Sequence, residues 1–400
     1  MPDSCIFLAT SPNVLGHFAA ALEGAGVVGE ERLTKLLYLA VTSRLLTEPV
    51  SIAVKGPSSG GKSHTVRKVL SFFPTDAYYE LSAMSEKALI YSKESLQHRF
   101  LVIYEAAGMK GDFAQYLIRS LLSEGRLRYE TVEKTAGGSL GPRLIERDGP
   151  TGLIVTTTLA AMHPENETRY LSVTVADTPE QTEQVLRALA ADTRTVEVNT
   201  EPWRQFQRWL ADGPREVAVP FANLLVDLMP PVAVRLRRDF GKLLTLIRAH
   251  ALLHRASREL DARGRVVATV NDYRQVHDLI VDVVAAGVEA TVPPNVRETV
   301  DAVTALLERP SHTVDFVAGV SSAQVADALG IDKSAAWRRV RVAMQKGYLE
   351  NLETRKGKRA RLVLGDPLPA DRTILPDPGE VEMLWSGCTV AGDPDKRDLF

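Results

Sequence analysis

Short apolar runs alternate with amphipathic segments up to about residue 178. Five of these runs have the length of a buried strand, and they lie at residues 50–54, 77–81, 100–104, 153–158 and 171–175. Apolar residues recur at helical spacing in the intervening stretches, for example at 62–73 and 113–124. Because strands that alternate with helices are typical of a parallel sheet covered by helices, the sequence predicts an α/β fold for this region.

From residue 179 to about residue 290 the pattern is almost wholly helical. Pro293 and Pro294 mark a boundary, and residues 295–365 then read as three helices followed by a hairpin. The remainder is rich in Pro, Asp and Gly, which favours an irregular tail. The sequence therefore predicts four parts, namely an α/β core at 1–178, a helical subdomain at 179–292, a small helix-and-hairpin domain at 293–365 and a tail at 366–400.

Composition and charge place the chain among ordinary globular proteins. Hydrophobic residues make up 45% of its 400 residues and charged residues 24%, with a net charge of −2. This charge excludes a polycation, so any surface for nucleic acid must be local. The two cysteines, Cys5 and Cys388, offer neither a disulfide framework nor a Cys-x-x-Cys metal pair. Because the sequence has neither a signal-peptide pattern nor an apolar run of about 18 residues, we expect a cytoplasmic protein without a membrane span.

A glycine-rich segment lies between a predicted strand and a predicted helix, and it reads Gly56-Pro57-Ser58-Ser59-Gly60-Gly61-Lys62-Ser63. It matches the phosphate-binding loop GxxxxGK[ST], whose glycines let backbone N–H groups approach the phosphates. The positive end of the following helix, which includes His64, adds to the attraction. Lys62 is the candidate for contacting the β and γ phosphates, and Ser63 is the candidate Mg²⁺ ligand. We therefore expect an ATPase with ATP and Mg²⁺ as cofactors.

The third apolar run ends at an acidic residue, Glu105. ATP hydrolysis requires a carboxylate that orients the attacking water, and Glu105 is the candidate for this role. The usual pair at this point is Asp-Glu, but Tyr104 stands in the first position. Without an aspartate there, Mg²⁺ is held either by Ser63 and water or by Glu105, which would then both bind the metal and orient the water. The alternative is that Glu105 has no catalytic role and is an ordinary strand-end residue. Of the three threonines that close the next strand, Thr157 is the candidate for contacting the γ-phosphate.

An arginine, Arg169, comes just before the last strand. In ring-forming ATPases an arginine at this point is presented to the nucleotide of a neighbouring subunit, where it stabilises transition-state charge. The alternative is that Arg169 forms a surface salt bridge, which contributes little.

Together these features resemble the AAA+ ATPases over about residues 13–290. Within them the resemblance is to the minichromosome-maintenance (MCM) helicase branch and to related replication helicases of mobile elements. Three stretches carry it, a hairpin at 128–146, an arginine-finger segment at 167–177 and a lid helix at 234–251. The resemblance implies a sensor-2 arginine at Arg238, with Arg237 or Arg235 as alternatives. It also implies a homo-oligomer, with a hexameric ring favoured, in which neighbouring subunits share ATP sites.

The hairpin is predicted because two extended stretches flank a glycine-rich turn at 136–141. The resemblance implies that it projects into the pore of the ring. Lys134 lies near its tip and is the candidate for contacting DNA there, while Arg143 and Arg147 lie further away.

The segment 322–365 resembles a winged helix-turn-helix, with a recognition helix at 334–344 and a basic wing at 355–361. Residues 331–365 contain ten Lys or Arg and three Asp or Glu, a local charge of +7. This patch suits contacts with DNA phosphates, and Trp337 in the helix is assigned to the core. The alternatives are a winged helix that contacts protein, or a solvated charged face. The DNA-binding candidates are Lys333, Arg338, Arg339, Arg341, Arg355, Lys356, Lys358 and Arg359.

Two functions of different classes fit these features. The favoured one is an ATP-driven DNA translocase or helicase-like motor that acts in DNA replication, for example of a mobile element. The alternative is an ATP-gated DNA-binding initiator, helicase loader or regulator with slow turnover, which the tyrosine at position 104 favours. A nucleotide-sensing component of a defence system is a weaker third reading. A nuclease is disfavoured, because no acidic metal cluster stands outside the ATP site.

Overall fold

The computed structural model describes residues 3–106, 112–134, 140–159, 164–190, 198–308, 319–353, 355, 358–368 and 373–390. The chain forms two compact units. The first unit comprises Met1–Met229, Arg237–Val283 and Leu375–Phe400, and the second comprises Pro230–Leu236 and Val284–Ile374. The chain therefore passes between the units at four points.

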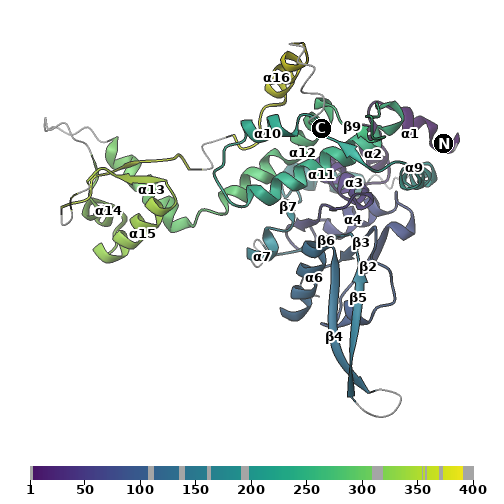
Figure 1. The fold of residues 1–400 in the computed structure, drawn as a ribbon, viewed down its shortest axis with the longest axis horizontal. Coiled ribbons are helices and arrows are strands. Elements are labelled where there is room, and N and C mark those ends of the chain that lie inside the picture. The colour runs from purple at the N-terminus through teal and green to yellow at the C-terminus, as the bar shows by residue number, and fades with distance from the viewer. Residues whose placement is uncertain are drawn as a thin grey trace. The chain divides into compact units, whose positions relative to one another are not determined.

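A five-stranded parallel sheet forms the centre of the first unit (Figure 1). Its strands, in spatial order, are β2 (Tyr78–Leu81), β3 (Arg99–Ile103), β6 (Thr151–Thr157), β1 (Ile52–Lys55) and β7 (Leu171–Thr174). In the register of the sheet, Ile52 of β1 lies opposite Ile154 of β6 and Leu171 of β7. All four residues of β1 and all seven of β6 are buried, because helices cover both faces of the sheet. The α/β fold predicted from the alternating apolar runs is confirmed.

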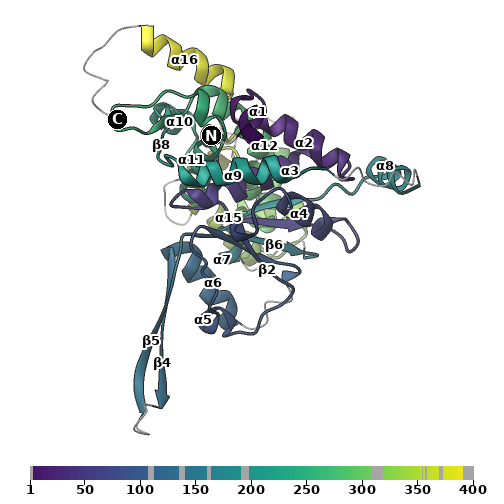
Figure 2. The ribbon, with the colours of Figure 1, turned by 90° about the vertical axis from the view of Figure 1, so that its right-hand side faces the viewer.

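Helices on the two faces of the sheet bury alternate residues of its strands. On one face, α6 (Asp112–Glu124) packs with the side chains of Leu101, Ile103, Leu153 and Val155 in one apolar cluster. The other face lies against α3 (Glu31–Thr42) and α4 (Lys62–Leu70), as Figures 1 and 2 show. Beyond them, the rings of Phe18, Tyr38, Phe72 and Trp203 pack with centroids 4.2–5.8 Å apart.

The remaining elements of the first unit surround this layered core. The helices are α1 (Ile6–Thr10), α2 (Val14–Gly24), α5 (Ala88–Tyr91), α7 (Pro164–Glu167), α8 (Pro179–Ala190), α9 (Glu201–Asp212), α10 (Ala222–Leu228), α11 (Leu236–Leu253) and α12 (Val270–Glu289), the last continuing into the second unit. The short strands β8 (Val217–Ala218) and β9 (Val266–Val267) pair in parallel. No single helix among the described residues is both long and apolar enough to cross a membrane.

A long antiparallel hairpin is inserted between α6 and β6. Its strands are β4 (Arg126–Lys134) and β5 (Leu140–Asp148), paired from Arg126–Asp148 to Lys134–Leu140. At the base of the hairpin, Leu127 and Ile145 are buried in the same apolar cluster as α6. The rest projects away from the sheet, as both views show (Figures 1 and 2).

The second unit contains three helices and a two-stranded sheet. These are α13 (Pro294–Leu307), α14 (Ser322–Leu329), α15 (Lys333–Gln345), β10 (Leu349–Asn351) and β11 (Leu362–Leu364). Ser321 and Gln324 form a capping box at the start of α14, Gly330 ends it at φ 63°, and Asp332 caps α15. The assignment of Trp337 to the core is wrong, because its side chain is 53% exposed.

The C-terminal segment differs from the irregular tail expected from its composition. Residues Pro378–Val390 form helix α16, which belongs to the first unit. The Asp377 carboxylate caps it by accepting hydrogen bonds from the backbone N–H groups of Gly379 and Glu380. The Tyr273 hydroxyl donates to the Pro376 carbonyl at 2.6 Å, and Val381 is fully buried. A cap and two anchoring contacts thus stabilise a helix in a Pro- and Gly-rich segment.

Candidate nucleotide site

The glycine-rich loop follows β1 and leads directly into α4. Gly56 has φ 149° and Gly61 has φ 77°, values that side chains rarely allow, and a Cβ at Gly56 would lie 2.4 Å from Val175 Cγ2. The Lys62 ammonium donates to the carbonyls of Gly56 at 2.9 Å and Pro57 at 2.6 Å. The loop therefore wraps around the lysine, and the N-terminal end of α4 points at the space that the loop encloses.

A cavity of about 610 Å³ adjoins this loop within the first unit. Loop residues from Pro57 to Gly61, together with His64 and Thr65, line its polar side. Val27, Val185 and Leu186 contribute an apolar wall from the segment before α3 and from α8. This volume and this mixture of walls suit a nucleotide, with phosphates at the loop and a base against the apolar side chains.

Two hydrogen bonds join the segments that form the apolar wall. Gln181 of α8 donates to the Val28 carbonyl at 2.6 Å, and the backbone N–H of Ala176, after β7, donates to Glu30 Oε1, before α3, at 2.9 Å. Burial lowers the pKa of His64, with contributions from the nearby cations Lys68 and Arg67. This wall is not predicted by the sequence motifs, although apolar residues at helical spacing after the last strand indicate an amphipathic α8.

Glu105 lies at the carboxyl edge of the sheet, the same edge as the loop. It has a left-handed backbone with φ 75°, and its N–H donates to Thr156 Oγ1 at 2.9 Å. Thr157 is fully buried; its hydroxyl oxygen accepts from the Leu159 N–H at 3.0 Å, and its carbonyl accepts from the Gly56 N–H at 3.2 Å. Thr158 is exposed. Thr156, which the sequence analysis did not single out, is thus the threonine in contact with Glu105.

Tyr104 stands in the position of the expected aspartate. Its hydroxyl donates to Glu80 Oε1 on the neighbouring strand β2. The Arg67 guanidinium lies 4.9 Å from the centroid of its ring. Burial and the bond to Glu80 raise the pKa of Tyr104, so the residue is uncharged at neutral pH. Position 104 therefore offers Mg²⁺ no carboxylate, and Glu80 is the nearby acid that the sequence analysis missed.

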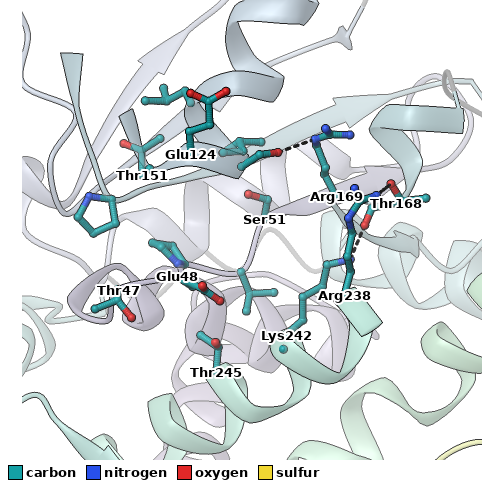
Figure 3. Close-up of a pocket in the computed structure, with 18 of the residues that line it drawn as sticks. Thr47, Glu48, Ser51, Glu124, Thr151, Thr168, Arg169, Arg238, Lys242 and Thr245 are labelled. Atoms are coloured by element: carbon teal, nitrogen blue, oxygen red, sulfur yellow. Dashed lines mark hydrogen bonds between the residues drawn. The ribbon is translucent and has the colours of Figure 1, made fainter. Parts of the chain in front are cut away.

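The two candidate arginines lie at a different cavity of about 560 Å³ (Figure 3). Arg169 Nε donates to Ser123 Oγ at 3.0 Å, and Arg238 Nη1 donates to Thr168 Oγ1 at 2.7 Å. Lys242 Nζ donates to the carbonyls of Thr168 at 3.0 Å and Tyr170 at 3.2 Å. Ser123 of α6 and Thr168, which follows α7, thus hold the two arginines on one side of this cavity.

This second cavity lies at the amino edge of the sheet. Arg169 precedes β7, whose first residue Leu171 is opposite Ile52, whereas the loop begins after Lys55 at the other end of β1. Four residues of strand separate the two edges, roughly 13 Å at about 3.3 Å per residue. Neither arginine lines the cavity beside the loop, whose lining includes Pro57–Gly61, His64 and Thr65 but not Lys62, Ser63 or Glu105. The structure therefore groups Lys62, Ser63 and Glu105 at one edge and Arg169 and Arg238 at the other.

The DNA-binding candidates differ in how far the structure leaves them exposed. Lys333, Arg338 and Arg341 on α15 are exposed, as are Arg355, Lys358 and Arg359, whereas Arg339 is partly buried and pairs with Glu298 at 2.9 Å. Lys356 lies outside the described residues. In the hairpin, Lys134 is the last residue of β4, and its side chain also lies outside the described part.

Arg143 and Arg147, the other two hairpin residues considered in the sequence analysis, are engaged within the first unit. Arg143 pairs with Glu133 across the strands at 2.7 Å, and Arg147 donates to the backbone carbonyls of Leu89 and Ile90. Of these three residues, Lys134 is therefore left as the candidate for contacting DNA.

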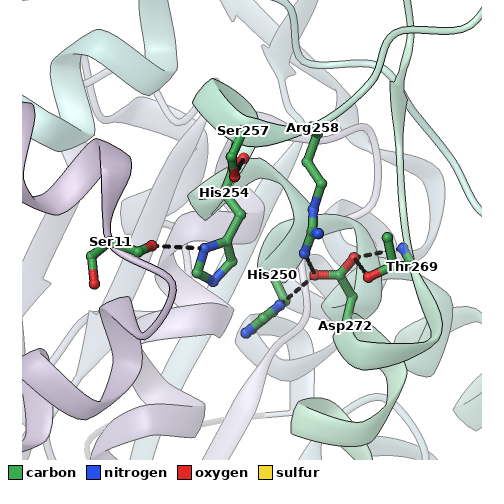
Figure 4. A network of polar contacts seen from close by, with 7 residues as sticks. All are labelled: Ser11, His250, His254, Ser257, Arg258, Thr269 and Asp272. Atoms are coloured by element: carbon green, nitrogen blue, oxygen red, sulfur yellow. Dashed lines mark hydrogen bonds and ion pairs between the residues drawn. The ribbon is translucent and has the colours of Figure 1, made fainter.

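A buried polar network lies elsewhere in the first unit (Figure 4). Asp272 is fully buried and accepts hydrogen bonds from His250 at 2.7 Å, from Arg258 at 2.5 Å and from the Thr269 N–H at 2.7 Å. Burial acts to raise its pKa, but the bonds from His250 and the charge of Arg258 lower it overall. The His254 ring lies beside His250, with its Nδ1 3.2 Å from the Ser11 carbonyl. The network joins α11 to the start of α12.

Residues 17–196 match the family model of the MTBMA_p00010 P-loop domain. These residues form a nucleotide-binding P-loop domain. The match includes the loop, Glu105 and Arg169, and it ends before Arg238. No curated protein has a sequence that matches this chain.

Three solved structures are similar to this chain at low identity. A full-length MCM homolog from Methanopyrus kandleri has 14% identity and a TM-score of 0.40 over 67% of this chain and 58% of that one, so the chain spans little more than half of its length. The Aeropyrum pernix ORC1 protein in complex with DNA has 13% identity and a TM-score of 0.28 over 94% and 97%. NtrX from Brucella abortus in complex with ADP has 13% identity and a TM-score of 0.29 over 82% and 72%.

Proposed function

We propose that this chain is an AAA+ ATPase that works as a DNA translocase or helicase-like motor in DNA replication, as a ring with ATP sites shared between subunits. The observation that carries this proposal is the separation of the predicted site residues onto opposite edges of one sheet. A nucleotide at Lys62 has neither Arg169 nor Arg238 of its own subunit beside it. A second copy, placed with its amino edge against the first copy's loop, would supply both.

The residues at the loop fit ATP and Mg²⁺. The backbone N–H groups from Ser58 to Lys62 and the Lys62 ammonium would hold the phosphates. Ser63 would ligate Mg²⁺, whose remaining ligands would be phosphate oxygens and water, since Tyr104 supplies no carboxylate. Bound Mg²⁺ neutralises charge on the β and γ phosphates. Glu105 would orient a water and accept its proton, and the neighbour's Arg169 would offset charge that develops on the γ-phosphate.

The exposed cations of the second unit support DNA as the partner. They lie on α15 and on the segment after β10, the two parts that a winged helix brings to a duplex. We propose that Lys134, at the end of β4, adds a contact to DNA in the pore of the ring. In this proposal residues 1–178 are the AAA+ core, 179–292 the lid and 293–365 the winged-helix domain.

Two observations favour the alternative, an ATP-gated initiator or loader with slow turnover. One is the uncharged Tyr104 in place of the metal-side acid. The other is the engagement of Arg143 and Arg147 in internal contacts, which leaves few cations for gripping DNA along the hairpin.

Steady-state ATP hydrolysis, measured with and without single-stranded and duplex DNA, tests the proposal. For a motor we expect DNA to stimulate turnover severalfold and the ATP-bound protein to have the mass of a ring. We expect Lys62→Ala to abolish hydrolysis, because it removes the ammonium that contacts the phosphates. Lys68→Ala, six residues further along the same helix and away from the loop, is the matched control and keeps full activity. Slow turnover that DNA does not change, with ATP-dependent duplex binding, would support the initiator instead.

A further inference from the structure

Helix α15 presents an aromatic residue outward among cations. Ala336, Val340 and Ala343 are buried and face the core of the second unit. At 100° per residue, Arg338 lies opposite this buried stripe, and Trp337 and Arg341 lie on one exposed flank of the helix. Trp337 is 53% exposed, although tryptophan is usually buried over most of its area. One exposed apolar side chain is common at a protein surface, so what makes Trp337 informative is the set of charged groups around it.

Arg341 holds the indole ring in this outward position. Its guanidinium lies 5.3 Å from the ring centroid, one turn further along the helix. The two side chains therefore restrict each other's rotation before any partner binds, which lowers the entropy cost of binding.

The charges around Trp337 select the partner. Lys333 and Arg338 are exposed near it, and the one acid at this end of the helix, Asp332, accepts hydrogen bonds from the N–H groups of Ser334 and Ala335. Arg339 turns to Glu298 of α13 and leaves the outward face. An aromatic residue within an excess of exposed cations complements a polyanion with apolar edges, as a nucleic acid has.

Shape favours the duplex among nucleic acids. An α-helix about 10–12 Å across fits the major groove of B-DNA, which is about 12 Å wide. In the groove the indole edge meets thymine methyl groups, and the indole N–H can donate to the O4, O6 or N7 acceptors of the bases. Arg338 and Lys333 on the same helix would reach the phosphates that border the groove.

We propose that Trp337, held by Arg341, is a base-reading residue, and that the second unit binds duplex DNA with a preference for a sequence containing thymine. This inference rests on the DNA contact of the proposed function, and it adds sequence preference, which phosphate contacts alone do not give. A motor with this surface would bind DNA preferentially at sites that carry the preferred sequence.

Selection by the full-length protein from a pool of duplexes with a randomised centre tests the inference. We expect the wild-type protein to enrich a defined sequence and to bind it at least about tenfold more tightly than the unselected pool, as one good base contact allows. Trp337→Ala is expected to lose this preference while it still binds the unselected pool. Val342→Ala, an exposed apolar residue elsewhere on the same helix, is the control and keeps the preference.

The outcomes separate the inference from the proposed function. If Trp337→Ala selects the same sequence as strongly as the wild type, or if the wild type enriches none, the inference is overturned. If Trp337 fluorescence, taken as the difference from Trp337→Phe, responds to single-stranded DNA alone, base-edge reading is overturned in favour of stacking. Arg338→Ala should weaken binding to every duplex about equally. If the wild-type protein binds no duplex at all, the DNA part of the proposed function fails with it.

Discussion

Glu105 has a backbone conformation that costs energy for a residue with a side chain. Its φ of 75° lies in the left-handed region, and the bond from its N–H to Thr156 Oγ1 helps to hold it there. In the phosphate loop, Ser59 is similarly left-handed at φ 65°. Strained residues persist where the surrounding structure holds them, and they cluster at functional sites. Among the described residues, two of the three left-handed residues that are not glycine lie at this edge, which supports its assignment to catalysis; the third, His98 at φ 56°, precedes β3 at the other edge.

Glu105→Gln tests this role directly. We expect the variant to bind a fluorescent ATP analogue with unchanged affinity and to hydrolyse ATP about 100-fold more slowly, because an amide cannot accept the proton of the attacking water. Phosphate release gives the rate, and titration of the analogue gives the affinity. Glu259→Gln, an exposed glutamate outside both cavities, is the control. Hydrolysis at the wild-type rate in Glu105→Gln would show that another group positions the water.

At the scale of residues, backbone requirements could be predicted and side-chain neighbours could not. The phosphate loop could be predicted from its glycines, because backbone positions with φ of 149° and 77° admit few other residues. Trp337 was expected in the core, but two small alanines and Val340 form the buried stripe of α15. Thr156 and Thr157 are adjacent in sequence, and strand alternation sends them to opposite faces of the sheet. Which of the two threonines contacts Glu105 depends on the register of the strands, and the sequence alone does not determine that register.

Among the elements, α11 and α12 are joined through the Asp272 network. His254, which is 4% exposed, lies at the edge of this network, where its ring contacts the carbonyl of Ser11. Burial, together with the charges of His250 and Arg258, lowers the pKa of His254 to about 4 from an ordinary value of 6.5. The folded protein therefore holds this imidazole neutral through a pH range in which the unfolded chain protonates it.

Stability should consequently fall as the pH falls from 6.5 toward 4, since protons bind preferentially to the unfolded state in that window. Between pH 7 and pH 5 the loss from this one group is about 2 kcal/mol. Urea unfolding at the two pH values measures it. His254→Gln is expected to be less sensitive to pH by this amount, whereas His17→Gln, at an exposed position, should behave as the wild type. Equal pH dependence in all three proteins would contradict the assignment.

The predicted elements were most accurate where a local pattern determines them. The apolar runs located the five strands of the sheet, and the glycine-rich turn located the hairpin. The engagement of Arg143 and Arg147 could not be predicted, because it depends on a cross-strand register and on carbonyls more than 50 residues away. Helix α16 was missed because Pro and Gly at its start suggested a loop, whereas Asp377 caps it there.

For the whole molecule, the positions of Lys62 and Arg169 predict that activity requires two copies. Arg169→Ala and Lys62→Ala should each be inactive alone. In an equimolar mixture about a quarter of the interfaces would pair an intact loop with an intact arginine, so we expect hydrolysis to recover to about a quarter of the wild-type rate. Phosphate release measured after mixing at increasing protein concentration checks this. No recovery at any ratio would argue against shared sites.

The path of the chain between the two units determines how they can be separated. After the second unit the chain returns to the first at Leu375, where Tyr273 bonds to Pro376 and Trp385 packs on Phe221. A fragment that ends at residue 283 would therefore lack part of its own core and expose aromatic side chains to aggregation. The nucleotide-binding unit is better isolated by excising the second unit internally and rejoining residue 283 to residue 375 through a flexible linker. In evolutionary terms, the second unit has the topology of an insertion, not of an appendage.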